Sequence, residues 1–181
     1  MRALTGSAPA ALPVPTPEPT RSPFPPLTGA TLVTSLLAGA AADVTWEFWA
    51  RVITPSLPGV GGPLEPAALV QSVFGFEHLL AAEVIHLVVG LVFYPLGYLF
   101  IARPLQRLVL PRLPWWLTAA GFGVGLWIFA LYVMAHLIAG LPPFLEFIPL
   151  AWASLAGHIL FGLVVGAVVR LRETPRPRTA P

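Results

Sequence analysis

The stretch HLLAAEVIHLVVGLVFYPLGYLFIA, residues 78–102, decides the fold that this sequence predicts. An apolar run of about 20 residues crosses the roughly 30 Å hydrocarbon core of a bilayer as a helix. Three further apolar stretches of similar length occupy residues 28–50, 115–139 and 147–169. Since short connections join antiparallel neighbours, the sequence predicts an all-α integral membrane protein, an antiparallel four-helix transmembrane bundle over residues 28–170.

The overall composition agrees with a membrane protein. Mean hydropathy is +0.80 and charged residues make up 10% of the chain, whereas soluble domains contain about 25%. There is no cysteine, which excludes disulfides, thiolate metal sites and iron–sulfur clusters. The basic residues flank the spans and form no single patch, so we expect the lipid bilayer as a partner and no nucleic acid.

Arginine placement predicts the orientation. All ten basic residues are arginines, and nine of them lie before the first span, between the second and third, or after the fourth. Only Arg51 lies on the other side. Cytoplasmic loops carry the excess of basic residues, so both termini are expected in the cytoplasm of a bacterial inner (plasma) membrane. Tryptophans favour membrane interfaces, which predicts Trp115 and Trp116 at the inner one and Trp46 and Trp49 at the outer one.

The regions outside the spans are rich in proline. Residues 1–27 predict a disordered cytoplasmic tail, and residues 171–181 an Arg/Pro-rich cytoplasmic tail. The outer loop, 53–76, contains a short predicted helix that starts near Pro66. An alternative interpretation treats Ala38–Asp43 as a signal-peptide cleavage site. The later spans would keep their orientation in that case.

Small and polar residues recur about every four positions along the spans, as in closely packed membrane helices. Gly121 and Gly125 predict such a packing seam in the third span. The second and fourth spans share the pattern H-x-x-x-G-L-V, which begins at His86 and again at His158. The shared pattern indicates that two helix hairpins arose by duplication.

Six ionisable residues fall within the spans, toward their outer halves: Asp43, Glu47, Glu83, His86, His136 and His158. A charged group at the centre of a bilayer costs roughly 2.5–3.5 kcal/mol on insertion scales, so such residues usually pair and have a function. Imidazoles with carboxylates suit a divalent transition metal such as zinc, copper, iron or manganese. They also suit a proton relay or polar path, or purely structural pairing. His86 and His158 could alternatively ligate haem b.

The arrangement resembles small bacterial four-helix inner-membrane proteins that carry no assigned activity. The resemblance rests on His86-Leu-Val-Val-Gly90, on residues 157–166 and on residues 121–127. It implies a fold and a location, and supplies no catalytic residues.

The sequence therefore predicts a polytopic inner-membrane protein, not an enzyme by any recognisable motif, that binds or conducts a cation through this polar site. One alternative is a haem-bearing electron-transfer subunit. Another is a structural or assembly subunit, in a homo-oligomer or larger membrane complex, with loop 53–76 as the contact surface.

Overall fold

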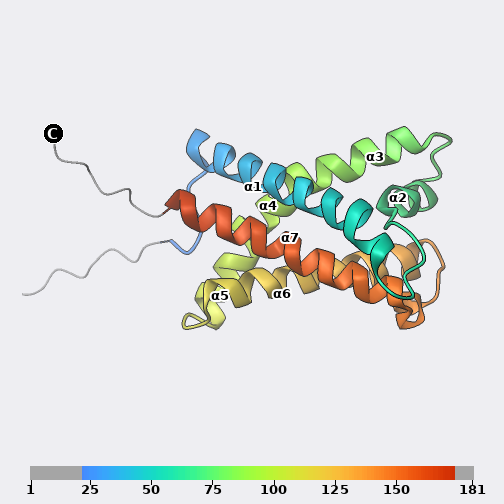
Figure 1. Ribbon diagram of the computed structural model, residues 1–181. Coiled ribbons are helices and arrows are strands. Elements are labelled where there is room, and N and C mark those ends of the chain that lie inside the picture. Colours follow the sequence, from blue (N-terminus) through green and yellow to red (C-terminus); the bar gives the residue numbers. More distant parts are fainter. Residues whose placement is uncertain (1–21, 174–181) are drawn as a thin grey trace, which may run out of the picture.

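The computed structural model describes residues 22–173, all of whose regular structure is helical (Figure 1). Residues 1–21 and 174–181, which hold most of both predicted tails, lie outside the described residues. The two ends of the described chain lie at the same end of the molecule.

Helix α1 (Gly29–Phe48) starts where the sequence places the first span. The Thr28 side chain accepts the backbone N–H of Thr31 at 3.2 Å and so caps the first turn. The helix continues through a π-helical turn, η1 (Trp49–Ile53), and ends in a 3-10 turn, η2 (Thr54–Ser56).

The second long segment runs without interruption from Leu79 to Val109. It comprises α3 (Leu79–Val88), η3 (Val89–Phe93), α4 (Tyr94–Gly97), η4 (Tyr98–Ala102) and α5 (Arg103–Val109). Pro95 lacks an N–H and cannot bond the carbonyl four residues earlier, that of Leu91. The π-helical turn η3 contains Leu91, and the close approach of its carbonyl leaves no room for a Cβ at Gly39 of α1.

The remaining segments are α2, α6, η5, η6 and α7. The predicted loop helix is present as α2 (Pro66–Phe74), which ends at Gly75 with a left-handed φ of 67°. The next segment is α6 (Trp115–Ile128) with η5 (Phe129–Ile138), and the last helix is α7 (Pro149–Glu173). Between them, η6 (Pro143–Phe147) has left-handed backbone at Phe144 and the three residues after it, a strained conformation for residues other than glycine.

Helix α7 lies between α1 and α6 and packs along both (Figure 1). A Cβ at Gly123 of α6 would overlap the backbone of His158 and Ile159, and one at Gly162 would overlap the Ala119 carbonyl. The predicted seam at Gly121 and Gly125 is wrong, because a Cβ at either position would meet nothing within 4 Å. The packing face of α6 instead follows Ala119, Gly123 and Trp127, which are buried at spacing four.

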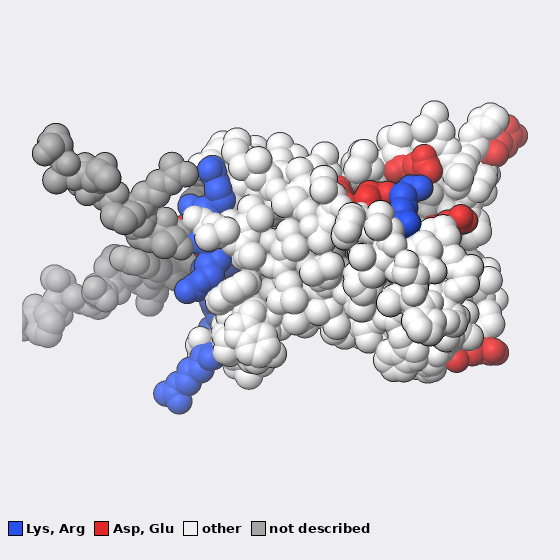
Figure 2. All heavy atoms as spheres, in the orientation of Figure 1, with Lys and Arg blue, Asp and Glu red and all other residues white. Residues whose placement is uncertain are grey.

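Three described helical segments are long and apolar enough to cross a membrane: Leu79–Val109, Trp115–Ile138 and Pro149–Glu173. Helix α1, which is richer in small and polar residues, is not among these three segments. Small alanines recur among the buried residues while large apolar side chains such as Phe93 and Leu108 are exposed, an arrangement that suits lipid around the helices. On the face drawn in Figure 2, basic side chains gather at one end, carboxylates with one basic side chain lie at the other, and the surface between the two ends is uncharged.

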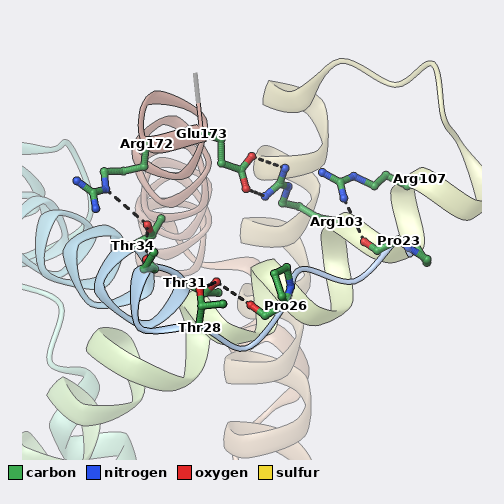
Figure 3. A network of polar contacts seen from close by, with 10 residues as sticks. Pro23, Pro26, Thr28, Thr31, Thr34, Arg103, Arg107, Arg172 and Glu173 are labelled. Atoms are coloured by element: carbon green, nitrogen blue, oxygen red, sulfur yellow. Dashed lines mark hydrogen bonds and ion pairs between the residues drawn. The ribbon is translucent and has the colours of Figure 1, made fainter. Parts of the chain in front are cut away.

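Polar contacts join the helices at the arginine-rich end (Figure 3). Arg103 of α5 donates two parallel bonds, at 2.6 and 2.7 Å, to the carboxylate of Glu173 at the end of α7. Arg172 donates to the Thr34 hydroxyl at 3.5 Å, which connects α7 to α1. Arg107 donates to the Pro23 carbonyl at 3.1 Å, so the segment before α1 is attached as well.

Candidate functional site

Asp43 is the most buried carboxylate of the described chain, with 6% of its surface exposed. Asp43 lies on the face of α1 that also buries Ser35 and Gly39. Oδ1 points at the backbone of Gly90, where a Cβ would overlap it, and Oδ2 has no hydrogen-bond partner. Gly90 belongs to the π-helical turn η3, a deformation often found at functional sites. A buried carboxylate oxygen without a partner is costly, so it needs an explanation.

Asp43 lines a cavity of about 410 Å³ that we call the acidic cavity. Glu47, Glu65 and Glu83 also line it, together with a single arginine, Arg51. Arg51 forms an ion pair with Glu47 and approaches Glu83 to 4.0 Å. Figure 2 shows one basic side chain among carboxylates at the end remote from the other basic side chains drawn in colour.

Arg51 balances only part of the negative charge around it. The hydrogen bond and the charge of Glu47 raise the pKa of Arg51 above its usual value, so the guanidinium stays protonated. Four carboxyl groups thus face one permanent positive charge around the acidic cavity. The arrangement attracts cations.

Trp46 lies one turn after Asp43 and packs against two of the predicted histidines. Its ring centroid lies 6.1 Å from that of His86 and 4.7 Å from that of His158. Trp46 is 5% exposed and its Nε1 has no hydrogen-bond partner. The indole is therefore part of the core and does not point outward as an interfacial anchor does. The position of Trp46 at the outer membrane interface stays a prediction. Trp49 is also turned inward, and its Nε1 donates to the Ala153 carbonyl at 2.9 Å.

His158 is held by its own helix. Its Nδ1 lies 2.8 Å from the Ser154 carbonyl and 3.3 Å from the Ser154 hydroxyl. Donation from Nδ1 to the carbonyl leaves Nε2 as the acceptor of a neutral imidazole. The two H-x-x-x-G patterns also have similar surroundings, since Gly90 and Gly162 each lie against a neighbouring helix and both histidines contact Trp46.

The Trp46 indole packs against both of the histidines predicted as haem ligands. Trp46, His86 and His158 line a small gap of about 10 Å³ and also a larger cavity, described below. Ligation of a haem by His86 and His158 stays a prediction.

The six predicted ligands do not form one metal site. In residues 22–173, no group of three or more His, Asp or Glu side chains is placed to hold a metal ion. His136 lies apart from the others, where its Nδ1 bonds the Leu141 carbonyl at 2.8 Å and its ring packs against Tyr132. Glu47 and Glu83 are directed toward Arg51. The structure thus brings Asp43, Glu47, Glu83 and His86 together around one cavity, and His158 adjoins it through Trp46.

A second cavity, of about 500 Å³, escaped prediction from the sequence. We call it the apolar cavity, because side chains such as Leu69, Val70, Phe74, Leu131 and Met134 form most of its wall. It lies between α2, the α3–η3 segment and η5. In Figure 1, α3 diverges from α1 toward the end of the molecule where α2 lies.

Comparison with known proteins finds no matching family model, curated protein or solved structure. The function is therefore inferred from the chemistry of the site itself.

Proposed function

We propose that this chain is a four-span membrane protein, with both ends in the cytoplasm, that binds a cation at Asp43 from the outer side. The support for four spans is that α1 packs along α7 beside three helices of membrane-spanning length and hydropathy. The support for the orientation is the separation of charge in Figure 2, since basic residues remain on the cytoplasmic side. The bacterial inner membrane, and the likeness to small four-helix proteins there, belong to this proposal.

The observation that carries the proposal is the unpartnered Oδ2 of Asp43 beside the acidic cavity. An ionised carboxylate in a site of low polarity is stabilised by a proton or by a positively charged partner. Glu47 and Glu83 raise the local concentration of cations at the entrance, and His86 provides a neighbouring proton acceptor.

A proton or another monovalent cation suits this site better than a transition metal does. Zinc and related ions require at least three protein ligands around one point. No such set is present within residues 22–173. One buried carboxylate is enough to hold a proton or to pair with an ammonium group.

Solid-supported-membrane electrophysiology tests the proposal, because it records the charge displaced when a cation enters a membrane-embedded site. We expect an acid pulse on the outer side to displace charge in the wild-type protein. Asp43→Asn removes the buried negative charge and should abolish most of the signal. Glu77→Gln is the matched control, because Glu77 is exposed at the same end and lines neither cavity. Equal signals from the wild type and Asp43→Asn, with protons and with sodium and zinc ions, would refute a cation site at Asp43.

A further inference from the structure

We propose that the acidic and apolar cavities form one binding site for a lipophilic amine, a molecule with one protonated nitrogen on an unbranched apolar body. The inference rests on the proposed function, since the ammonium group is the cation that pairs with Asp43. It goes further by assigning the class of molecule and the place of its apolar part.

The two cavities adjoin each other. Leu64, Glu65, Pro66 and His86 line both of them. Asp43 lines the acidic cavity and Trp46, one turn later on α1, lines the apolar cavity. These shared residues form the boundary between the two cavities. A molecule that extends across it has one end among carboxylates and the other among apolar side chains.

The charge of the acidic cavity selects a cationic end. The charged groups that line it are Asp43, Glu47, Glu65, Glu83 and Arg51. Arg51 is already paired with Glu47, so Asp43 is left without a basic partner. An anionic phospholipid headgroup or a fatty acid would bring net negative charge among these carboxylates, so both are repelled.

The apolar cavity has a volume within the range of small-molecule sites. Its polar lining consists mainly of Glu65 and His86 at the boundary and Ser154 and His158 in the interior. The unpartnered Nε1 of Trp46 adds a second buried polar atom without a partner beside this space. The apolar lining of this space suits an alkyl chain.

Binding of radiolabelled dodecylamine to the protein in phosphatidylcholine nanodiscs tests the inference, with empty nanodiscs as the control for partitioning into lipid. We expect saturable binding that unlabelled dodecylamine displaces. Dodecanol and dodecanoate have a chain of the same length without the positive charge, and each should compete at least about tenfold more weakly. This comparison uses only the wild-type protein, so it does not depend on the folding of a variant.

Two substitutions separate the two halves of the site. Asp43→Asn should weaken dodecylamine binding at least about tenfold by removing the charge partner. Val70→Trp places an indole in the apolar cavity and should reduce binding by a similar factor. Val73→Trp is its control, because Val73 lies on the same helix, is equally half-buried and lines neither cavity.

Failure of this inference can be told apart from failure of the proposed function. Charge displacement that depends on Asp43, without saturable dodecylamine binding, would overturn the amine site and leave the cation site standing. Saturable binding that Val70→Trp weakens but Asp43→Asn does not, with dodecanol competing equally, would also overturn the amine site. The cation site would fall only if the charge displacement were equal in the wild type and Asp43→Asn as well.

Discussion

The backbone of Gly90 lies directly against the carboxylate of Asp43, so closely that a Cβ at position 90 would overlap Oδ1. The contact joins η3 of the second long segment to α1, and it is what brings a buried acid to the edge of the acidic cavity. Only glycine permits it. A substitution at Gly90 therefore affects both the packing of η3 against α1 and the position of the Asp43 carboxylate.

Gly90→Ala should lower the free energy of unfolding by about 1–3 kcal/mol, the usual cost of forcing a methyl group into a filled interface. Gly125→Ala is the control, since a Cβ there meets nothing within 4 Å and the substitution should stabilise the helix by up to about 1 kcal/mol. Thermal unfolding in detergent measures both. In a double-mutant cycle, Asp43→Ala should recover part of the loss by opening space for the new methyl group. Additive effects would contradict the contact.

Gly123→Ala should be at least as destabilising, and no side-chain substitution should rescue it. Its Cβ would meet the backbone of α7 at His158 and Ile159, and a helix backbone cannot move aside as a side chain can. Gly121→Ala, two residues earlier on the exposed side, should be neutral or slightly stabilising. Melting temperatures of the two variants in the same detergent decide between the two faces of α6. A larger loss at position 121 would restore the seam predicted from the sequence.

The sequence was sufficient to predict the helical segments, because apolar length and flanking arginines are strong constraints in a membrane. It could not choose the packing face of α6. Gly121, Gly123 and Gly125 alternate along the helix, and residues two apart point to nearly opposite sides, so the pattern supports either face.

The candidate site could be predicted only in part. Asp43, Glu47, Glu83 and His86 share a cavity as expected, because spacing and depth placed them near one another. His136 follows the same spacing, yet it lies at a helix end where its ring bonds the Leu141 carbonyl. In the sequence, Trp46 resembles an interfacial anchor. Its burial depends on how α7 and η3 pack against α1, and the sequence around Trp46 does not reveal this packing. The duplication of two hairpins and the resemblance to other inner-membrane proteins remain predictions.

The ion pair between Arg103 and Glu173 should make a small contribution to stability. Glu173 is 47% exposed on its side chain, so we expect Arg103→Gln to cost about 1 kcal/mol or less in the free energy of unfolding. Arg112→Gln, an exposed arginine at the same end, is the control. The charge-swapped double variant Arg103→Glu with Glu173→Arg should recover stability relative to either single change, measured by thermal unfolding at low salt. Equal losses in the single and double variants would mean that the pair contributes nothing.

The absence of cysteine allows the orientation to be tested without a background of native thiols. Gly62→Cys introduces a thiol into the loop before α2, at a position where an added Cβ meets nothing within 4 Å. Arg112→Cys introduces one into the exposed connection between α5 and α6. If both ends of the chain are cytoplasmic, a membrane-impermeant maleimide added to intact cells should label position 62 and should reach position 112 only after the membrane is opened. Arg51 would then face outside while Arg103, Arg107 and Arg112 face inside, as the distribution of basic residues requires. Labelling of position 112 in intact cells would reverse the orientation, and the acidic cavity would then open to the cytoplasm.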